Sequence, residues 1–372
     1  MQRAQPARHA RWALVRSLLL GVAFVLAAAF LLWLKTVETD GLGLSLPSEL
    51  QDFTTLALSI VVEALPFVIL GALVSVIVRL FAPTERILRL LPKRPLLRRL
   101  SISLFGTFMP VCECGNVPVA RGLVIRGLSV AESTTFLLAA PIINPVTLLA
   151  TYQAFPLDPS IVWIRMAGGL LIANLVGGLI ALYKDQMELV SKGFYNTLCQ
   201  VGTADDLHHH EHHHEHHDHD QHHEHHDDHD HHHVSNRWWD RWQEGIVIFR
   251  DEVSLMLKVL CLGALIAGAT QVFVPRDVLT SLGSDPFLSI LAMIALAFII
   301  SICANVDAFF ALAYSNTFTI GSIVAFLVFG PMIDIKMLTM MRTTYKVRLL
   351  AVITLLVTLT SILIGLVVNY AL

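Results

Sequence analysis

The segment Met109–Pro118 reads MPVCECGNVP and brings two thiols, a carboxylate and an amide together with two prolines and a glycine. This composition predicts a helix break, because proline lacks a backbone donor and clashes with the preceding turn. A broken helix exposes backbone groups that can coordinate an ion or a substrate. The thiols of Cys112 and Cys114 could hold a soft metal or metalloid, although two thiols alone make an incomplete site. A kink repaired by neighbouring helices is the alternative.

A second predicted break, Pro141-Ile-Ile-Asn-Pro145, resembles the later segment Gly330-Pro-Met-Ile-Asp-Ile-Lys336. Ionisable side chains inside apolar runs cost about 2.5–3.5 kcal/mol each and usually mark pathways or relays. The alternative is a structural ion pair that joins Asp307 or Asp334 to Lys258 or Lys336. The candidate residues of a substrate pathway are Glu63, Cys112, Glu113, Cys114, Asn116, Pro118, Asn144, Pro145, Lys258, Cys303, Asn305, Asp307, Asp334 and Lys336.

A polar insert in the middle of the chain contains 17 of the 18 histidines. It has no apolar residue that could bury a core, which predicts disorder. Neutral imidazole binds Zn, Ni, Co and Cu, and the interleaved carboxylates offset the metal charge. We therefore expect a divalent transition metal here, although such tracts also arise as low-complexity expansions. The candidate ligands are His208, His209, His210, His212, His213, His214, His216, His217, His219, His222, His223, His225, His226, His229, His231, His232 and His233.

The elements that carry these residues are membrane helices. The chain has 372 residues, 55% apolar and 15% charged, whereas soluble domains have about 25% charged residues. Continuous apolar runs exclude a soluble enzyme, a nucleic-acid binder and an outer-membrane barrel. The runs are Leu18–Leu34, Thr54–Val78, Leu100–Val119, Ala131–Ala154, Ile161–Tyr183, Gly245–Val274, Pro286–Ala313, Ile320–Met341 and Leu349–Leu372. The fold class is therefore an all-α polytopic membrane protein, with an uncleaved N-terminal anchor helix.

The two halves resemble each other in three ordered places. The sequence LGALVS at Leu70 matches LGALIA at Leu262, an offset of 192 residues. CGNV at Cys114 matches CANV at Cys303, and Pro-Ile-Ile-Asn at Pro141 matches Pro-Met-Ile-Asp at Pro331, with offsets of 189 and 190. Ordered matches at a near-constant offset favour an internal duplication, and internal repeats around a midplane site are typical of secondary transporters.

Seven Lys and Arg between Arg79 and Arg99 predict that this loop is cytoplasmic. If Leu100–Val119 and Pro286–Tyr314 dip into the membrane and return, Arg121, Arg348 and the His-rich insert are cytoplasmic too. Each half then has three spans, which makes the repeats inverted. The small residues of the span Ile161–Tyr183 predict close helix packing and no chemistry. The expected division is 1–52 (anchor and external loop), 53–184 (first repeat), 185–244 (cytoplasmic linker with the His tract) and 245–372 (second repeat).

The Cys-x-Cys-Gly-Asn-x-Pro, Pro-x-x-Asn-Pro and Gly-Pro-x-x-Asp-x-Lys segments resemble those of the ArsP/YraQ-like predicted permeases, over about Thr54 to Leu372 without the insert. The resemblance implies an inner-membrane permease of two similar halves, and some members export trivalent organoarsenicals. It places Cys112, Cys114, Asn116, Pro118, Asn144, Pro145, Asp334 and Lys336 at motif positions. The His insert departs from the family pattern and is reminiscent of zinc and nickel transporters.

These features predict a secondary permease, not an enzyme, that exports a small metal, metalloid or organometalloid species through a midplane site, with an accessory metal-binding loop. No Gly-Lys-Ser/Thr is present for a phosphate-binding loop. The lipid bilayer and the small substrate are the expected partners, nucleic acid is not, and a homo-oligomer is compatible with the sequence. Two alternatives stay open: a membrane thiol-redox enzyme that uses Cys112 and Cys114, and a metal-binding receptor without transport.

Overall fold

The computed structural model describes residues 48–81, 91–108, 112–205, 237–273 and 285–371. Within these residues the chain is helical, without strands; Val190 and Tyr345 form one isolated bridge. Five described helical segments are long and apolar enough to cross a membrane: 49–80, 130–154, 160–181, 245–272 and 347–371. This confirms the all-α polytopic membrane class. The predicted anchor Leu18–Leu34 and the His tract lie outside the described residues.

The helices follow the same order in the two halves. The first half contains α2 (Ser48–Phe81), α4 (Pro95–Phe105), the 3₁₀ turn η1 (Gly106–Phe108), α5 (Glu113–Ile125), α6 (Val130–Ile143), α7 (Pro145–Ala154) and α8 (Ser160–Ala181). A connecting region contains η2 (Gln186–Leu189) and α9 (Lys192–Asp205). The second half contains α10 (Arg237–Phe273), α12 (Pro286–Ile300), α13 (Asp307–Ala313), α14 (Ile320–Phe329), α15 (Ile335–Met341) and α16 (Val347–Ala371). This order agrees with a duplication, which stays a prediction.

Local sequence explains where several helices begin. Ser129 precedes α6, and its hydroxyl accepts a hydrogen bond from the Glu132 backbone while the Glu132 carboxylate accepts one from the Ser129 backbone. This reciprocal capping box satisfies two backbone donors that the first helical turn leaves without partners. Asp285 caps α12 and Thr319 caps α14 in the same general way. Short polar residues therefore separate the long apolar runs into distinct helices.

The predicted interruptions are present. Helix α6 ends at Ile143 and α7 begins at Pro145, whereas five residues separate α14 from α15. The break predicted within Met109–Pro118 ends at Cys112, because Glu113–Pro118 belongs to α5, and Met109–Val111 lies outside the described residues. Pro118 is tolerated because its missing N–H removes a single helical hydrogen bond, the one to the Cys114 carbonyl.

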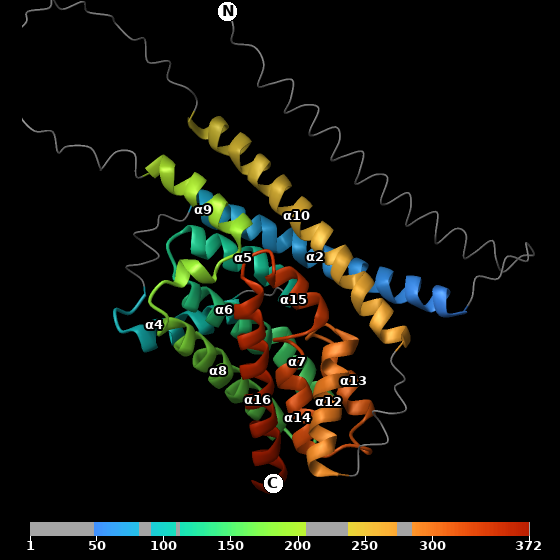
Figure 1. Cartoon of the computed structure of the whole chain (residues 1–372). Helices are drawn as coiled ribbons and strands as arrows, with labels where there is room; N and C mark the ends of the chain where they lie inside the picture. Colours follow the sequence, from blue (N-terminus) through green and yellow to red (C-terminus); the bar gives the residue numbers. More distant parts are fainter. Residues whose placement is uncertain (1–47, 82–90, 109–111, 206–236, 274–284, 372) are drawn as a thin grey trace, which may run out of the picture.

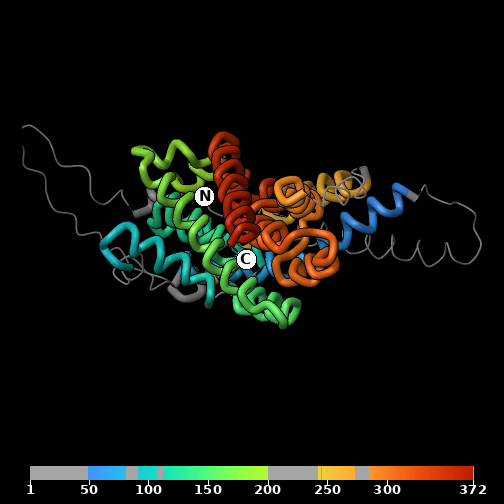
Figure 2. The backbone as a smooth tube through the Cα atoms, turned by 90° about the horizontal axis from the view of Figure 1, so that it is seen from below, coloured from blue at the N-terminus to red at the C-terminus, as the bar shows by residue number. Residues whose placement is uncertain are grey.

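The long helices α2 and α10 lie side by side across one end of the bundle (Figure 1). Helices α4–α6 and α8 of the first half gather on one side, and α12–α14 of the second half on the other, with α16 between them (Figure 2). The short helices next to the breaks contact the opposite half: α5 packs on α15, and α7 packs on α13. This reciprocal exchange brings the interrupted segments of both halves into the centre.

Small residues allow the close helix contacts. A Cβ added at Gly71 of α2 would collide with the carbonyl oxygen of Gly115 in α5, so the two backbones touch directly. In α8, a Cβ at Gly177 would collide with the Thr135 hydroxyl of α6, and one at Gly169 would meet Ile142. The packing role expected for the small residues of α8 is therefore present, as small residues permit close approach of membrane helices.

A buried ion cluster joins both halves near one end of the bundle. Arg121 of α5 and Arg79 of α2 pair with the two carboxylate oxygens of Glu252 in α10, at 2.8 Å and 2.9 Å. The Arg121 guanidinium also donates to the Thr343 carbonyl and lies 4.4 Å from the ring centre of Phe194. Arg121 therefore lies at the same end as the turn between α15 and α16. Which side of the membrane this end faces stays a prediction.

Candidate functional site

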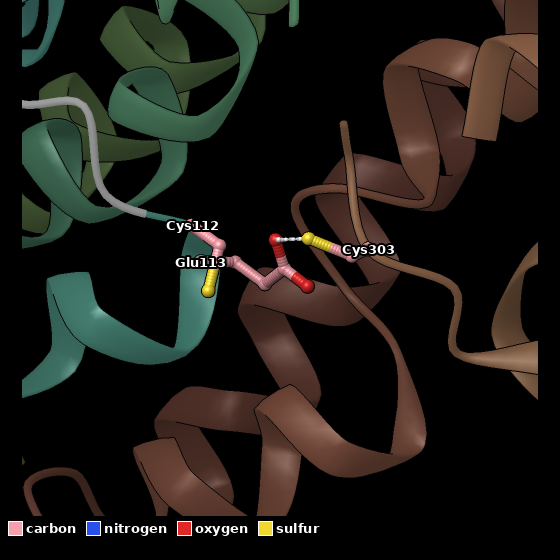
Figure 3. A group of neighbouring side chains, drawn as sticks. All are labelled: Cys112, Glu113 and Cys303. Atoms are coloured by element: carbon pink, nitrogen blue, oxygen red, sulfur yellow. Dashed lines mark hydrogen bonds between the residues drawn. The ribbon is translucent and has the colours of Figure 1, made fainter. Parts of the chain in front are cut away.

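Two thiols and one carboxylate converge where the interrupted segments of the halves meet. Cys112 is the residue before α5, Glu113 is the first residue of that helix, and Cys303 lies between α12 and α13. Their ligand atoms all lie within 4.8 Å of one another, and all three residues are buried. The Glu113 carboxylate extends from α5 toward the Cys303 thiol, which donates to it across 3.8 Å (Figure 3). The Cys112 thiol also interacts with the Cys114 thiol, so the structure extends the expected Cys112–Cys114 pair by Glu113 and by Cys303 of the other half.

A lysine from the second half contacts the same carboxylate. The Lys336 ammonium lies 3.0 Å from Glu113 Oε1 and 3.8 Å from Asp334 Oδ2, and it also donates to the Ser301 carbonyl at 3.4 Å. Ser301 ends α12 in a left-handed conformation with φ 53°, which directs the chain away from the helix axis. The four residues Glu113, Ser301, Asp334 and Lys336 are all buried. Two carboxylates therefore share one ammonium group, which leaves one formal negative charge in excess.

Asn116 lies one helical turn after Glu113 and has no exposed surface. Neither its side-chain oxygen nor its side-chain nitrogen has a hydrogen-bond partner among the described residues. An unsatisfied buried amide costs about 1–3 kcal/mol and calls for an explanation, such as a ligand or an ion. Because residues three apart share one helix face, Asn116 extends the polar face that Glu113 begins.

A second polar cluster surrounds the start of α13. The guanidinium of Arg165 in α8 binds both oxygens of the Asp307 carboxylate, at 3.0 Å and 2.6 Å, and donates to the Thr151 hydroxyl at 2.8 Å. Nearby, the Thr147 hydroxyl of α7 donates to the amide oxygen of Asn305 at 3.1 Å. Arg165 and Asp307 are both buried, and their charges balance. This bidentate pair fixes α13 to the opposite half.

Several candidates have structural tasks. Asn144 accepts a hydrogen bond from the Val146 backbone and caps α7, and Asp334 caps α15 through Met337. Asn144 and Asp334 occupy matched positions in the two halves. Pro118 lies buried within α5, and Pro145 is exposed at the start of α7. Cys114 is buried in the first turn of α5, where its thiol interacts with the Cys112 thiol.

Two candidates do not join the site. Glu63 in α2 and Lys258 in α10 are exposed and make no contact with the buried clusters. The alternative of a structural ion pair between Lys258 and Asp307 or Asp334 is therefore not found among the described residues. Asp307 pairs with Arg165 instead, while the expected contact of Asp334 with Lys336 is present at 3.8 Å.

Sequence reasoning missed Arg165. The span Ile161–Tyr183 was interpreted from its small residues alone as a packing helix, so its arginine, which is fully buried against Asp307, was not among the candidates. The available signal was a charged residue in the fifth position of an apolar run, opposite in sign to Asp307 in another run. Charged side chains inside a membrane usually pair with one another, so an ion pair between Arg165 and Asp307 could have been predicted.

The long apolar helices and their interruptions define a class, the polytopic helical membrane protein. Residues 49–370 match the family described as ArsP_1, predicted permease, and the chain belongs to this family. The UPF0718 protein YcgR of Bacillus subtilis is 34% identical over 81% of this chain and 91% of its own length. A Streptococcus mutans protein, named as a subunit of a two-component membrane permease complex, is 30% identical over 82% of this chain and 90% of its own length.

The UPF0718 protein YraQ of Escherichia coli is 30% identical over 30% of this chain and 31% of its own length. No solved structure matches. The family and the apolar helices together identify a multi-pass membrane protein of a transporter family, as the sequence motifs predicted.

Proposed function

We propose that this chain is a secondary permease of the bacterial inner membrane that exports a soft metal, metalloid or organometalloid species between its two halves. The convergence of Cys112, Glu113 and Cys303 within 4.8 Å carries the proposal. Thiolates select soft ions, and a carboxylate completes a three-ligand set. Because the two thiols come from different halves, a relative motion of the halves would assemble or separate the set, as alternating access requires.

Among the proposed cargos, the charge balance favours cations such as Zn²⁺ or Cd²⁺ over arsenite and methylarsenite, which are uncharged at neutral pH. Glu113 and Asp334 share the single ammonium of Lys336, whereas Arg165 and Asp307 neutralise each other. An uncompensated charge in a buried site is costly. A cationic cargo near Glu113 would remove the excess, and the unpartnered Asn116 amide offers additional polar atoms. Export, as the direction, rests on the resemblance to family members that export organoarsenicals.

The His-rich insert enters this proposal as an accessory. Its histidines would bind Zn, Ni, Co or Cu on the cytoplasmic side and regulate transport or buffer the cargo. Placing Arg121 and Arg348 on the same side follows the rule for positive charge, and the contact of Arg121 with Thr343 is compatible with it. Single cysteines at positions 126, at the end of the helix that carries Arg121, and 348 are at least partly exposed. Both should stay unmodified by a reagent added outside intact cells and should react once the membrane is permeabilised. Labelling of either position in intact cells would reject this topology.

The decisive experiment is flux into proteoliposomes that contain the purified full chain. Zn²⁺, Cd²⁺, arsenite and methylarsenite are offered in parallel, and Cys112→Ser and Cys303→Ser are compared with the wild type. Both substitutions should reduce flux of a thiophilic cargo about 10–100-fold, the range over which even outer-shell changes weaken metal sites. Cys261→Ser is the matched control, because Cys261 lies on α10 outside the cluster. Unchanged flux in both cluster variants would reject a thiol-dependent site.

The same preparation separates the two alternatives. A receptor without transport would bind the species without flux at any gradient. A thiol-redox enzyme would show thiol-dependent turnover that needs Cys112 and Cys114 and is indifferent to Cys303. The transport proposal predicts instead that substitution of Cys303 reduces flux as much as substitution of Cys112.

A further inference from the structure

Two charged side chains lie at the midpoints of their membrane spans and face outward. Glu63 is central in the span Glu49–Leu80, and Lys258 is central in the span Gly245–Val272. Both are exposed, and no described residue forms an ion pair or a hydrogen bond with either. Charged groups at this depth are rare and almost always paired or directed to a cavity. Something outside the described residues must therefore compensate them.

The two charges lie at similar heights. The contacts of Gly268 with Ala57 and of Gly245 with Val76 show that α2 and α10 run antiparallel. Glu63 follows Ala57 by six residues and Lys258 precedes Gly268 by ten, which places them within about one helical turn of each other along the pair. The opposite faces of these helices are occupied, since α2 packs on α5 and α10 packs on α15. The exposed faces of these two neighbouring helices therefore carry one negative and one positive charge at similar height.

We propose that this outward surface of α2 and α10 is a dimer interface with a second copy of this chain, in which Glu63 of each copy pairs with Lys258 of the other. A twofold interface presents the same patch on both copies, so one negative and one positive group at similar height complement themselves. The surrounding exposed residues Leu70, Leu73, Leu262 and Leu265 are apolar and suit a lipid-excluding contact.

Among the segments outside the described residues, the predicted anchor is the apolar run long enough to cross a membrane beside α2 and α10. The predicted anchor Leu18–Leu34 contains no charged residue and could neutralise neither group. The proposal goes beyond the permease function, because it assigns residues outside the cluster to assembly. Dimerisation would also influence transport, because α2 packs on α5, which carries Glu113, and α10 packs on α15, which carries Lys336.

Charge reversal tests the proposal in the full-length protein. Wild type, Glu63→Lys, Lys258→Glu and the double reversal are reconstituted in lipid nanodiscs, and the oligomeric state is measured by mass photometry over a range of protein-to-lipid ratios. Wild type should be dimeric. Each single reversal should weaken dimerisation roughly tenfold or more, because like charges then meet twice. The double reversal restores both pairs and should return the dimer. A monomeric wild type, or a double reversal as monomeric as the singles, would overturn the proposal.

The neutral variants Glu63→Gln and Lys258→Met serve as controls in case the charge-reversal variants do not fold. Each removes the ion pair without introducing repulsion and should still weaken the dimer. Cross-linking identifies the neighbour in a Cys261→Ser background. A Glu63→Cys chain co-expressed with a differently tagged Lys258→Cys chain should form a mixed disulfide dimer. Three results would contradict a self-complementary interface. They are a chain with both cysteines that forms only an intramolecular disulfide, a cross-link to the anchor segment, and assembly only with a different membrane subunit.

Discussion

Glu113 and Lys336 stand 223 positions apart in the sequence, yet their side chains meet at 3.0 Å. Glu113 opens α5 of the first half, and Lys336 lies in α15 of the second. This contact joins α5 to α15 at the centre of the molecule. It places a negative charge of the first half beside a positive charge of the second.

Replacing Lys336 by Met should destabilise the protein strongly. The substitution leaves Glu113 and Asp334 buried without their ammonium partner, and breaking a buried pair costs about 3–5 kcal/mol. The double variant Glu113→Gln/Lys336→Met should recover much of this loss without recovering flux. Thermal unfolding in detergent measures the difference, and Lys346→Met, at an exposed position, is the control. Equal stability of Lys336→Met and the control would show that the pair does not hold the halves together.

Asn116→Ala should abolish flux with no loss of stability. Its amide has no described partner, so its removal relieves an unsatisfied buried group that costs about 1–3 kcal/mol. Asn144→Ala is the contrasting variant, because Asn144 caps α7 and its loss should cost about 0.5–2 kcal/mol. Unfolding midpoints and flux are measured on both proteins. An Asn116→Ala protein with wild-type flux, or one destabilised as much as Asn144→Ala, would remove Asn116 from the pathway.

Gly71→Ala should disrupt the contact between α2 and α5. The new Cβ would collide with the Gly115 carbonyl oxygen, and backbone cannot rotate away as a flexible side chain can. Overpacking of this kind costs about 1–3 kcal/mol or more. Gly193→Ala in α9 meets no atom within 4 Å and should be neutral or slightly stabilising. Detergent-resistant folded yield compares the two, and a fully folded Gly71→Ala protein would question the close approach.

Deletion of His208–His233 should leave basal flux unchanged and remove most divalent metal binding. Metal binding requires neutral imidazole, whose unperturbed pKa is about 6.5, so protonation should weaken Zn²⁺ or Ni²⁺ binding as the pH falls below about 6. Isothermal titration at about pH 7.5 and about pH 5.5, on either side of that pKa, tests this on the full chain and on the deletion. Loss of flux in metal-free buffer would instead make the insert part of the transport machinery.

Composition and the length of the apolar runs were sufficient to predict the membrane class, because the hydrophobic thickness of a bilayer sets the length of a spanning helix. Proline and short polar residues also predicted the interruptions near Cys112, Asn144 and Asp334, since caps and breaks depend on neighbours in sequence. The extent of α5 could not be predicted in this way, because the removal of one helical hydrogen bond by Pro118 is outweighed by the packing around it.

Pairing was decided by tertiary structure alone. Cys303 of the other half joins Cys112 and Glu113, Asp307 pairs with Arg165, and Glu63 and Lys258 are exposed. Each of these outcomes depends on which helices of the two halves face each other, above all on the contacts of α5 with α15 and of α7 with α13. Hydrophobicity places a segment in the membrane without specifying its neighbours. The sequence therefore determined which residues lie at membrane depth, and only packing determined which of them are buried and which of them meet.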